Sequence, residues 1–265
     1  MTPTIAVATD GSNPIKSALF SAIDGWGEVL ILDPEREHPD LLDHDLDLYH
    51  MARRREPSLA DLRRACEAGI ETVNAYEEAR TLVDRQACGK MLADAGLRTP
   101  ATQYGRAEGI DLDPPLIAKP RYELGPLRHQ VEVLAEGELD FEGEHFVQEY
   151  VPHEESIKLY QLGTETGAVT GVEASRQPTR EREVTEGLCA IADRIRERTG
   201  LELFEVDLVV GEEGYYVVDV NAAVSMRGVS DGYAAYETLL YDRVQQSIGR
   251  RAGTAVPATA VEQRT

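Results

Sequence analysis

The sequence predicts an α/β (α+β) protein, with a small parallel layer first and a larger region of strands and helices after it. The first observation is the opening order of an apolar strand at 4–8, a helix from 14 to about 24, and a second strand at 28–32. That order is how a parallel α/β layer begins. The second observation is a series of apolar strands between 114 and 221, interrupted by helical spacing at 183–200.

The first 80 residues are expected to form a Rossmann-like domain. A helix is predicted near Ser58–Ala68, with Ser58 as its N-cap and Gly69 as its stop. Residues 69–79 are then expected to return as strand and turn. The glycine pattern after the first strand is not GxGxxG, so no dinucleotide fingerprint is predicted.

A second domain is expected over residues 81–250, followed by a flexible tail at 251–265 that is small and polar. It begins with a helix that ends at Gly96. The remaining expected elements are strands at 114–120, 145–151 and 156–163, a helix at 183–200, a hairpin at 204–221 and a helix at about 231–248.

Charge and composition exclude several partners. The net charge is -21, with 48 acidic and 27 basic residues, which argues against nucleic acid or an anionic membrane. An acidic surface with only four lysines suggests a salt-rich, halophilic cytoplasm. The three cysteines are scattered and predict no metal site. No signal peptide and no membrane span are recognised, so a cytoplasmic protein is expected.

The hairpin at 204–221 places polar groups where apolar side chains are expected. If residues 212–214 form a three-residue loop, Gly211 pairs with Tyr215 and Asp207 lies opposite Asp219, about 5 Å away at Cβ. Asn221 then shares the face of Asp219. Two carboxylates and an amide suit Mg²⁺. Alternatively one aspartate is protonated or paired with an arginine, and a four-residue loop would turn Asp207 to the other face.

Two of the four lysines, Lys119 and Lys158, lie inside apolar strands. Burying lysine is costly unless it meets an anion, and phosphate is an anion that an ammonium group binds well. Two lysines and a two-carboxylate Mg²⁺ site therefore predict a nucleoside triphosphate site. The alternative is that both lysines extend from edge strands into water.

These motifs together resemble those of the ATP-grasp superfamily, over about 82–248. "VDRQACGKMLADAGLRTPAT" resembles the helix and turn that open the fold, and "PLIAKP" the first nucleotide-binding strand. "HFVQEYV" resembles the adenine hinge, "SIKLYQLG" the second basic strand, and "FEVDLVV…YYVVDVNAA" the metal motif. The resemblance implies an ATP-grasp fold that binds ATP and Mg²⁺, with Mn²⁺ as an alternative ion. The implied ligands are Lys119 and Lys158 for phosphate, Glu149, Tyr150 and Val151 for adenine, and Asp207, Asp219 and Asn221 for the metal.

The sequence departs from the family in three places. Asp84-Arg85 stands where Asp-Lys is usual, and the proline after the asparagine motif is missing. The segment after Lys119, "KPRYELGPLRHQV", replaces a glycine-rich flap, so Arg128 and His129 are candidates to cover the phosphates themselves.

The resemblance implies an ATP-dependent enzyme in one of two branches. The RimK-like and glutathione-synthetase-like branch joins a carboxylate to an amine through an acyl phosphate. The inositol-trisphosphate-kinase-like branch phosphorylates a polyol. Arg176 and Lys158 are the candidate catalytic residues. The alternative for Arg176 is that it lies in a solvated, charged loop. The expected partners are a small-molecule or peptide substrate and a second copy in a homodimer. A non-catalytic ATP-binding module stays as a third reading.

Overall fold

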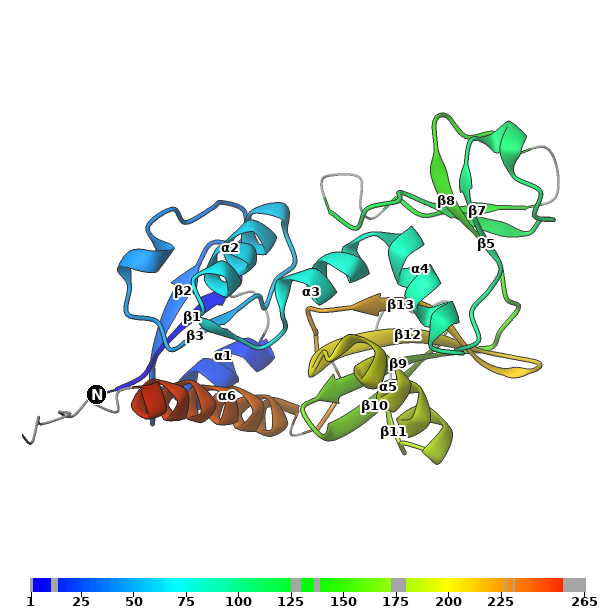
Figure 1. The fold of residues 1–265 in the computed structure, drawn as a ribbon. Coiled ribbons are helices and arrows are strands. Elements are labelled where there is room, and N and C mark those ends of the chain that lie inside the picture. The colour runs from blue at the N-terminus through cyan, green and yellow to red at the C-terminus, as the bar shows by residue number, and fades with distance from the viewer. Residues whose placement is uncertain are drawn as a thin grey trace, which may run out of the picture.

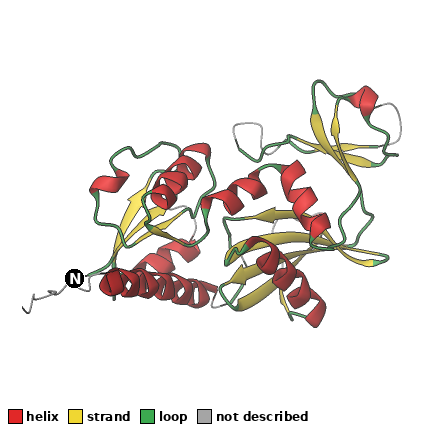
Figure 2. Cartoon of the chain, in the orientation of Figure 1, coloured by secondary structure: helices red, strands yellow, loops and turns green. Residues whose placement is uncertain are grey.

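The computed structural model has three bodies in a row: an N-terminal layer, a large antiparallel sheet, and a small sheet at the far end (Figure 1). The residues described here are 2–10, 14–124, 130–135, 139–172, 180–226, 228–230 and 232–254. Within these ranges, no helix is both long enough and apolar enough to cross a membrane. The fold is mixed α/β, as predicted (Figure 2).

The N-terminal layer is a parallel sheet with strand order β2-β1-β3-β4. Its register pairs Thr4–Ala8 with Glu28–Leu32 throughout, as two apolar strands joined by one helix require. The elements are β1 (Thr4–Ala8), α1 (Pro14–Ile23), β2 (Glu28–Leu32), the 3-10 turn η1 (Leu41–Asp43), β3 (Leu48–His50), α2 (Glu56–Glu67) and β4 (Glu71–Thr72).

Helix α2 begins two residues before the expected cap. Arg55 is the N-cap residue, and Ser58 stands at the third helical position, where its Oγ accepts the Arg55 N–H at 2.9 Å. Pro57 fits the first turn because a proline lacks the N–H that would be unpaired there. The prediction of Ser58 as N-cap was wrong. Ser58 lies inside the helix, and its hydroxyl accepts the backbone N–H of the N-cap residue, Arg55.

Two helices lead out of this layer, α3 (Tyr76–Val83) and α4 (Arg85–Asp94). Asp84 separates them with an extended backbone and caps α4, accepting the Gln86 N–H at 3.0 Å. Helix α4 packs against the edge strand of the large sheet, and the small sheet follows it in the chain. The segment 83–85 is therefore where all three bodies approach one another (Figure 1).

The small sheet has strand order β5-β8-β6-β7 and is antiparallel. Lys119 ends one strand and lies opposite Phe146 of its neighbour. Successive side chains alternate between faces, so Lys119, Phe146 and Gln148 share one face. The elements are β5 (Thr102–Gly105), the turn η2 (Ala107–Gly109), β6 (Leu116–Lys119), β7 (Glu132–Leu134) and β8 (His145–Glu149).

The large sheet has strand order β11-β10-β9-β12-β13 and is also antiparallel. Its apolar face packs on α5, which ends at Gly200 in the left-handed conformation (φ 72°) that glycine adopts without strain. The elements are β9 (Glu155–Leu162), β10 (Glu165–Val172), β11 (Arg180–Arg182), α5 (Glu186–Thr199), β12 (Leu203–Gly211) and β13 (Gly214–Asn221).

The last helix, α6 (Gly232–Thr254), returns to the N-terminal layer and lies along α1 (Figure 1). Its buried side chains Tyr236, Leu240 and Val244 share a core with Leu19 and Ile23 of α1. The first four residues of the expected tail, 251–254, are helical, and the rest of that tail lies outside the described residues.

Candidate functional site

Asp207 and Asp219 lie directly opposite each other on the neighbouring strands β12 and β13, as predicted. The route to this pairing differs from the expected one. The turn holds only two residues, so Gly211 pairs with Gly214 rather than with Tyr215. A β-bulge beside Leu208 then leaves Val218 out of the register, so that Asp207 again pairs with Asp219.

This bulge decides which face Asp219 occupies. A two-residue turn without a bulge would set Val218 opposite Asp207 and turn Asp219 toward the apolar face, opposite Val206. The extra residue shifts the strand by one position, which moves a side chain to the other face of a sheet. The bulge therefore brings the two carboxylates together.

Lys158 lies on the adjacent strand, β9, paired with Asp207. Its ammonium group donates to Asp207 Oδ1 at 2.5 Å and to Glu205 Oε1 at 3.0 Å. Burial by itself would lower the pKa of Lys158, but the charges of Asp207 and Glu205 outweigh it and raise that pKa. Lys158 is therefore a fixed positive charge between two carboxylates.

Glu205 is a member of this cluster that the sequence reasoning missed. Its second carboxylate oxygen accepts the backbone N–H of Ser225 at 2.9 Å, so Glu205 holds both Lys158 and the segment after β13. The available signal was spacing, because Glu205 precedes Asp207 by two residues and must share its face. A buried acid at that position needs a cation, and Lys158 supplies it.

The metal prediction is supported by chemistry but stays a prediction. Asn221 lies opposite Glu205 and two residues beyond Asp219, on the same face. Among the described residues, no three His, Cys, Asp or Glu side chains are already grouped as a metal centre. The set of two aspartates and one amide fits Mg²⁺, which prefers a few hard oxygen ligands and completes its shell with water and phosphate.

The two aspartates have opposite pKa shifts. Burial raises the pKa of Asp207, and Glu205 and Asp219 add to this effect against the opposing charge of Lys158. Burial would also raise the pKa of Asp219, but the positive charges of Lys119, Arg85 and Arg54 help to lower it. Asp219 is therefore the carboxylate of the pair that stays ionised most readily.

Lys119, the other predicted phosphate ligand, is the last residue of β6 in the small sheet. It is 9% exposed, and its ammonium group donates to Gln148 Oε1 at 2.9 Å. Burial lowers its pKa, although the charge of Asp219 acts in the opposite direction. A buried lysine whose hydrogen-bond acceptor is a neutral amide keeps donors for an incoming anion. Gln148, which the sequence reasoning did not select, orients it.

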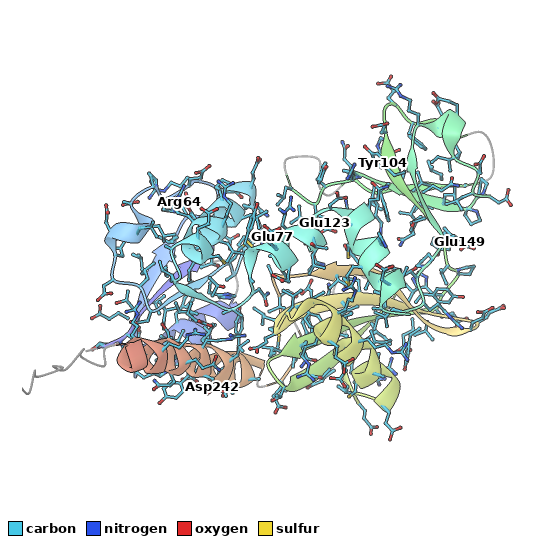
Figure 3. All side chains as sticks on the ribbon, in the orientation of Figure 1. Arg64, Glu77, Tyr104, Glu123, Glu149 and Asp242 are labelled. Carbon is cyan, nitrogen blue, oxygen red and sulfur yellow. The ribbon has the colours of Figure 1, made fainter. Side chains whose placement is uncertain are left out.

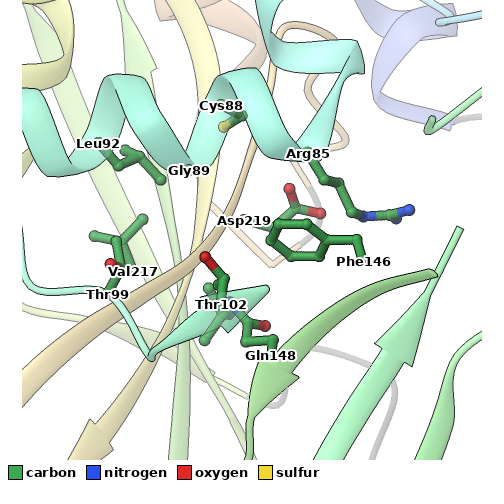
Figure 4. Close-up of a pocket in the computed structure, with 11 residues that line it drawn as sticks. Arg85, Cys88, Gly89, Leu92, Thr99, Thr102, Phe146, Gln148, Val217 and Asp219 are labelled. Atoms are coloured by element: carbon green, nitrogen blue, oxygen red, sulfur yellow. The ribbon is translucent and has the colours of Figure 1, made fainter. Parts of the chain in front are cut away.

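A pocket lies between helix α4, the small sheet and the large sheet (Figure 4). Asp219 of β13 and Gln148 of β8 line the pocket. Phe146, also on β8, lies next to Gly89 of α4. Figure 4 shows the Asp219 side chain between Phe146 and α4, and the Arg85 side chain extending from the start of α4. The pocket therefore brings a predicted metal ligand and the residue that orients Lys119 to one place.

The predicted hinge at 149–151 connects the small sheet to the large one. The N–H groups of Glu149 and Tyr150 donate to Ala101 O at 2.8 Å and to Pro115 O at 3.0 Å. The carbonyl of Val151 accepts from His153 Nδ1 at 2.7 Å. These bonds fix the course of the hinge, and the adenine contacts of these residues stay a prediction.

The segment after Lys119 is fastened to the start of α4. Arg121 pairs with Asp84 through two nitrogens, the shorter bond being 2.6 Å, and its guanidinium lies over the ring of Tyr104. The N–H of Arg85 donates to Arg121 O at 3.0 Å. This part of the segment is therefore anchored to the start of α4. The other basic candidates, Arg128, His129 and Arg176, lie outside the described residues.

Lys158 and the paired aspartates lie on the large sheet, and Lys119 lies on the small sheet. No protein-family model and no curated protein matches the sequence. Solved structures do match. A RimK domain ATP-grasp protein from Sphaerobacter thermophilus aligns with a TM-score of 0.76 at 20% identity, covering 91% of this chain and 98% of that one.

Two further structures show the same arrangement. The D-alanine–D-alanine ligase of Bacillus anthracis, complexed with ATP, aligns with a TM-score of 0.68 at 16% identity, covering 96% of this chain and 100% of that one. The ATP-grasp ligase PsnB, complexed with a precursor peptide and AMPPNP, aligns with a TM-score of 0.68 at 16% identity, covering 91% and 97%. The chain has the ATP-grasp fold, as its motifs predicted.

Proposed function

We propose that this protein is an ATP- and Mg²⁺-dependent carboxylate–amine ligase that works through an acyl phosphate. The observation that supports the proposal is the pairing of Asp207 with Asp219 beside Lys158 on the large sheet, while Lys119 of the small sheet is close enough for the charges of Asp219 and Asp207 to act on its pKa. Lysines on both sides and paired carboxylates suit a metal-bound triphosphate, since both neutralise its charge.

The proposed reaction has two steps. A carboxylate oxygen of the substrate attacks the γ-phosphorus, the bond to the β–γ bridging oxygen breaks, and ADP leaves. An amine then attacks the acyl carbon, loses a proton, and releases inorganic phosphate. Lys119 and Lys158 would orient the phosphates, and Asp207, Asp219 and Asn221 would hold the ion. Bound Mg²⁺ would neutralise the charge that develops on the transferred phosphoryl group.

The acceptor class is left to experiment, and the comparisons suggest its range. The PsnB structure holds a precursor peptide, so peptides with free carboxylates belong in the screen beside amino acids and other small acids. Inositol phosphates test the kinase alternative. The acidic surface argues for assays at high salt, where screening relaxes self-repulsion. Sedimentation of the same samples tests the proposed homodimer.

The first test measures ADP and phosphate release with Mg²⁺ and pairs of acids and amines. Release that needs both partners, and that falls at least about 100-fold in Asp219→Asn, would support the ligase. The matched control is Asp242→Asn on α6, far from the site in Figure 3. A phosphorylated polyol without free phosphate would establish the kinase instead. AMP-PNP binding without turnover of any pair would favour the binding module.

A further inference from the structure

A buried carboxylate that no motif accounts for lies beside the candidate metal strand. Glu123 follows Lys119 by four residues, and its side chain is 3% exposed. It forms ion pairs with two arginines from different parts of the chain. Arg85, the first residue of α4, is 3.0 Å away, and Arg54 comes from the N-terminal layer just after β3. Glu123, labelled in Figure 3 beside helices α3 and α4, therefore links the N-terminal layer to the start of α4.

Arg85, one of the ion-pair partners of Glu123, lines the same pocket as Asp219. Glu123 and Asp219 each act on the pKa of the other. Within the described structure, both Glu123 oxygens are held by ion pairs rather than by well-aligned hydrogen bonds. Burial raises the pKa of Glu123, and Asp219 adds to this against the charge of Arg54.

Two guanidinium groups contact Glu123, and one of them, Arg85, shares a pocket lining with Asp219. The charges of Arg85 and Arg54 also act on Asp219. Because Glu123 engages both arginines, neither needs Asp219 as its ion-pair partner. Without the negative charge of Glu123, Arg85 would be left with Asp219 as a carboxylate in the pocket that both line, and a guanidinium paired with Asp219 would compete with a metal ion.

We propose that Glu123 is a positioning residue, which engages Arg54 and Arg85 so that Asp219 stays turned toward Asp207 and available to a divalent cation. This inference rests on the proposed function, because it assumes that Asp219 is a metal ligand. It adds that the N-terminal layer, through Arg54, takes part in holding the metal strand.

The test uses the full chain and calorimetric binding of AMP-PNP, with and without Mg²⁺. In Glu123→Gln we expect metal-free binding within about threefold of wild type, because the lysines are untouched. The additional affinity that Mg²⁺ confers should fall by about tenfold, the equivalent of 1.4 kcal/mol. Glu144→Gln is the matched control, since Glu144 is an exposed acid just before β8 that accepts a hydrogen bond from the Tyr104 hydroxyl at 3.0 Å.

A second variant separates positioning from folding. Arg54→Gln should reduce the Mg²⁺-dependent gain in the same direction, and the double variant should lose less than the sum of the two. A structural role alone would lower the melting temperature and weaken metal-free and Mg²⁺-dependent binding together, which would overturn the proposal. So would an unchanged Mg²⁺ gain in Glu123→Gln. If the wild type binds no AMP-PNP at all, the proposed function itself fails.

Discussion

Lys158 and Asp207, paired across β9 and β12, are joined by a hydrogen bond of 2.5 Å, and the same ammonium group reaches Glu205 at 3.0 Å. One lysine thus balances two carboxylates on the face that carries the candidate metal ligands. Because an ammonium group and a divalent cation both neutralise carboxylates there, the stability of the site and its proposed metal binding should be linked. That link can be measured.

Replacing Lys158 with methionine should destabilise the protein by about 1–3 kcal/mol, because Glu205 loses a partner while it is buried. Mg²⁺ should restore part of the lost stability, because without Lys158 the carboxylates of Asp207 and Glu205 are better ligands for a cation. Urea unfolding with and without Mg²⁺ measures both effects. Lys90→Met, at an exposed i,i+4 pair with Asp94, is the control and should change stability little. A Mg²⁺ effect no larger than in wild type would contradict the link.

Replacing Lys119 with methionine should have the opposite effect on stability. Burial lowers the pKa of Lys119, so the charged side chain opposes folding, and an apolar side chain of similar length should be neutral or more stable by about 1 kcal/mol. The gain should be full below the folded-state pKa and shrink as the pH rises toward the unfolded value of about 10.4. AMP-PNP affinity should fall about tenfold. Stability lost together with affinity would count against this account.

The Asp84–Arg121 pair should make stability depend on pH at the acid end. Burial raises the pKa of Asp84, but the bonds from Arg121 and the Gln86 N–H outweigh it, and the net pKa is lowered. A lowered folded-state pKa adds stability that is present above the unfolded pKa of about 3.9 and is lost as the pH falls through the folded value.

Asp84→Asn, which keeps a capping side chain, should therefore cost about 1 kcal/mol at pH 7, a low value because the pair reaches solvent. Wild type and variant should converge in acid. Urea midpoints measured from pH 7 to pH 3 test this, and a difference that is constant across that range would refute it.

Asn74 should be among the most sensitive polar positions outside the site. Its amide nitrogen donates to Leu203 O and Ala222 O at 2.6 and 3.2 Å, and its oxygen accepts the N–H of Glu202 and Leu203. Asn74→Ala should cost about 2–3 kcal/mol in urea unfolding, because these buried backbone groups lose their partner. Asn74→Asp should cost more at pH 7, where a carboxylate faces two carbonyls, and less in acid. A cost below that of Asp84→Asn would be evidence against this role.

Much of the fold follows from local patterns. The strands that carry Lys119 and Lys158 were recognised because each is a short apolar run, and the Lys119 strand is also bounded by prolines. Gly200 and Pro57 mark helix ends by backbone chemistry alone. Helix α6 runs beyond its expected end, where Arg250 and Arg251 pair with acids of the N-terminal layer that are distant in sequence, and no local pattern contains that information.

The site was predicted in part, and the failures have a physical cause. The pairing of Asp207 with Asp219 was correct, but it came from a three-residue loop without a bulge, whereas the chain uses a two-residue turn with one. The two differences cancel in register. Glu205 and Glu123 were missed because an acid becomes significant only through partners that are distant in sequence, here Lys158 and Arg54.

The return of α6 to the N-terminal layer sets an order for folding during synthesis. Leu19 and Ile23 emerge from the ribosome more than two hundred residues before Tyr236 and Leu240, which complete their core. Until then the first-made layer exposes an apolar surface that only the last-made helix covers. Domains generally fold in order of synthesis, but in this chain the layer made first should become protected last. Arrested nascent chains that end before residue 232 should therefore keep that layer sensitive to protease.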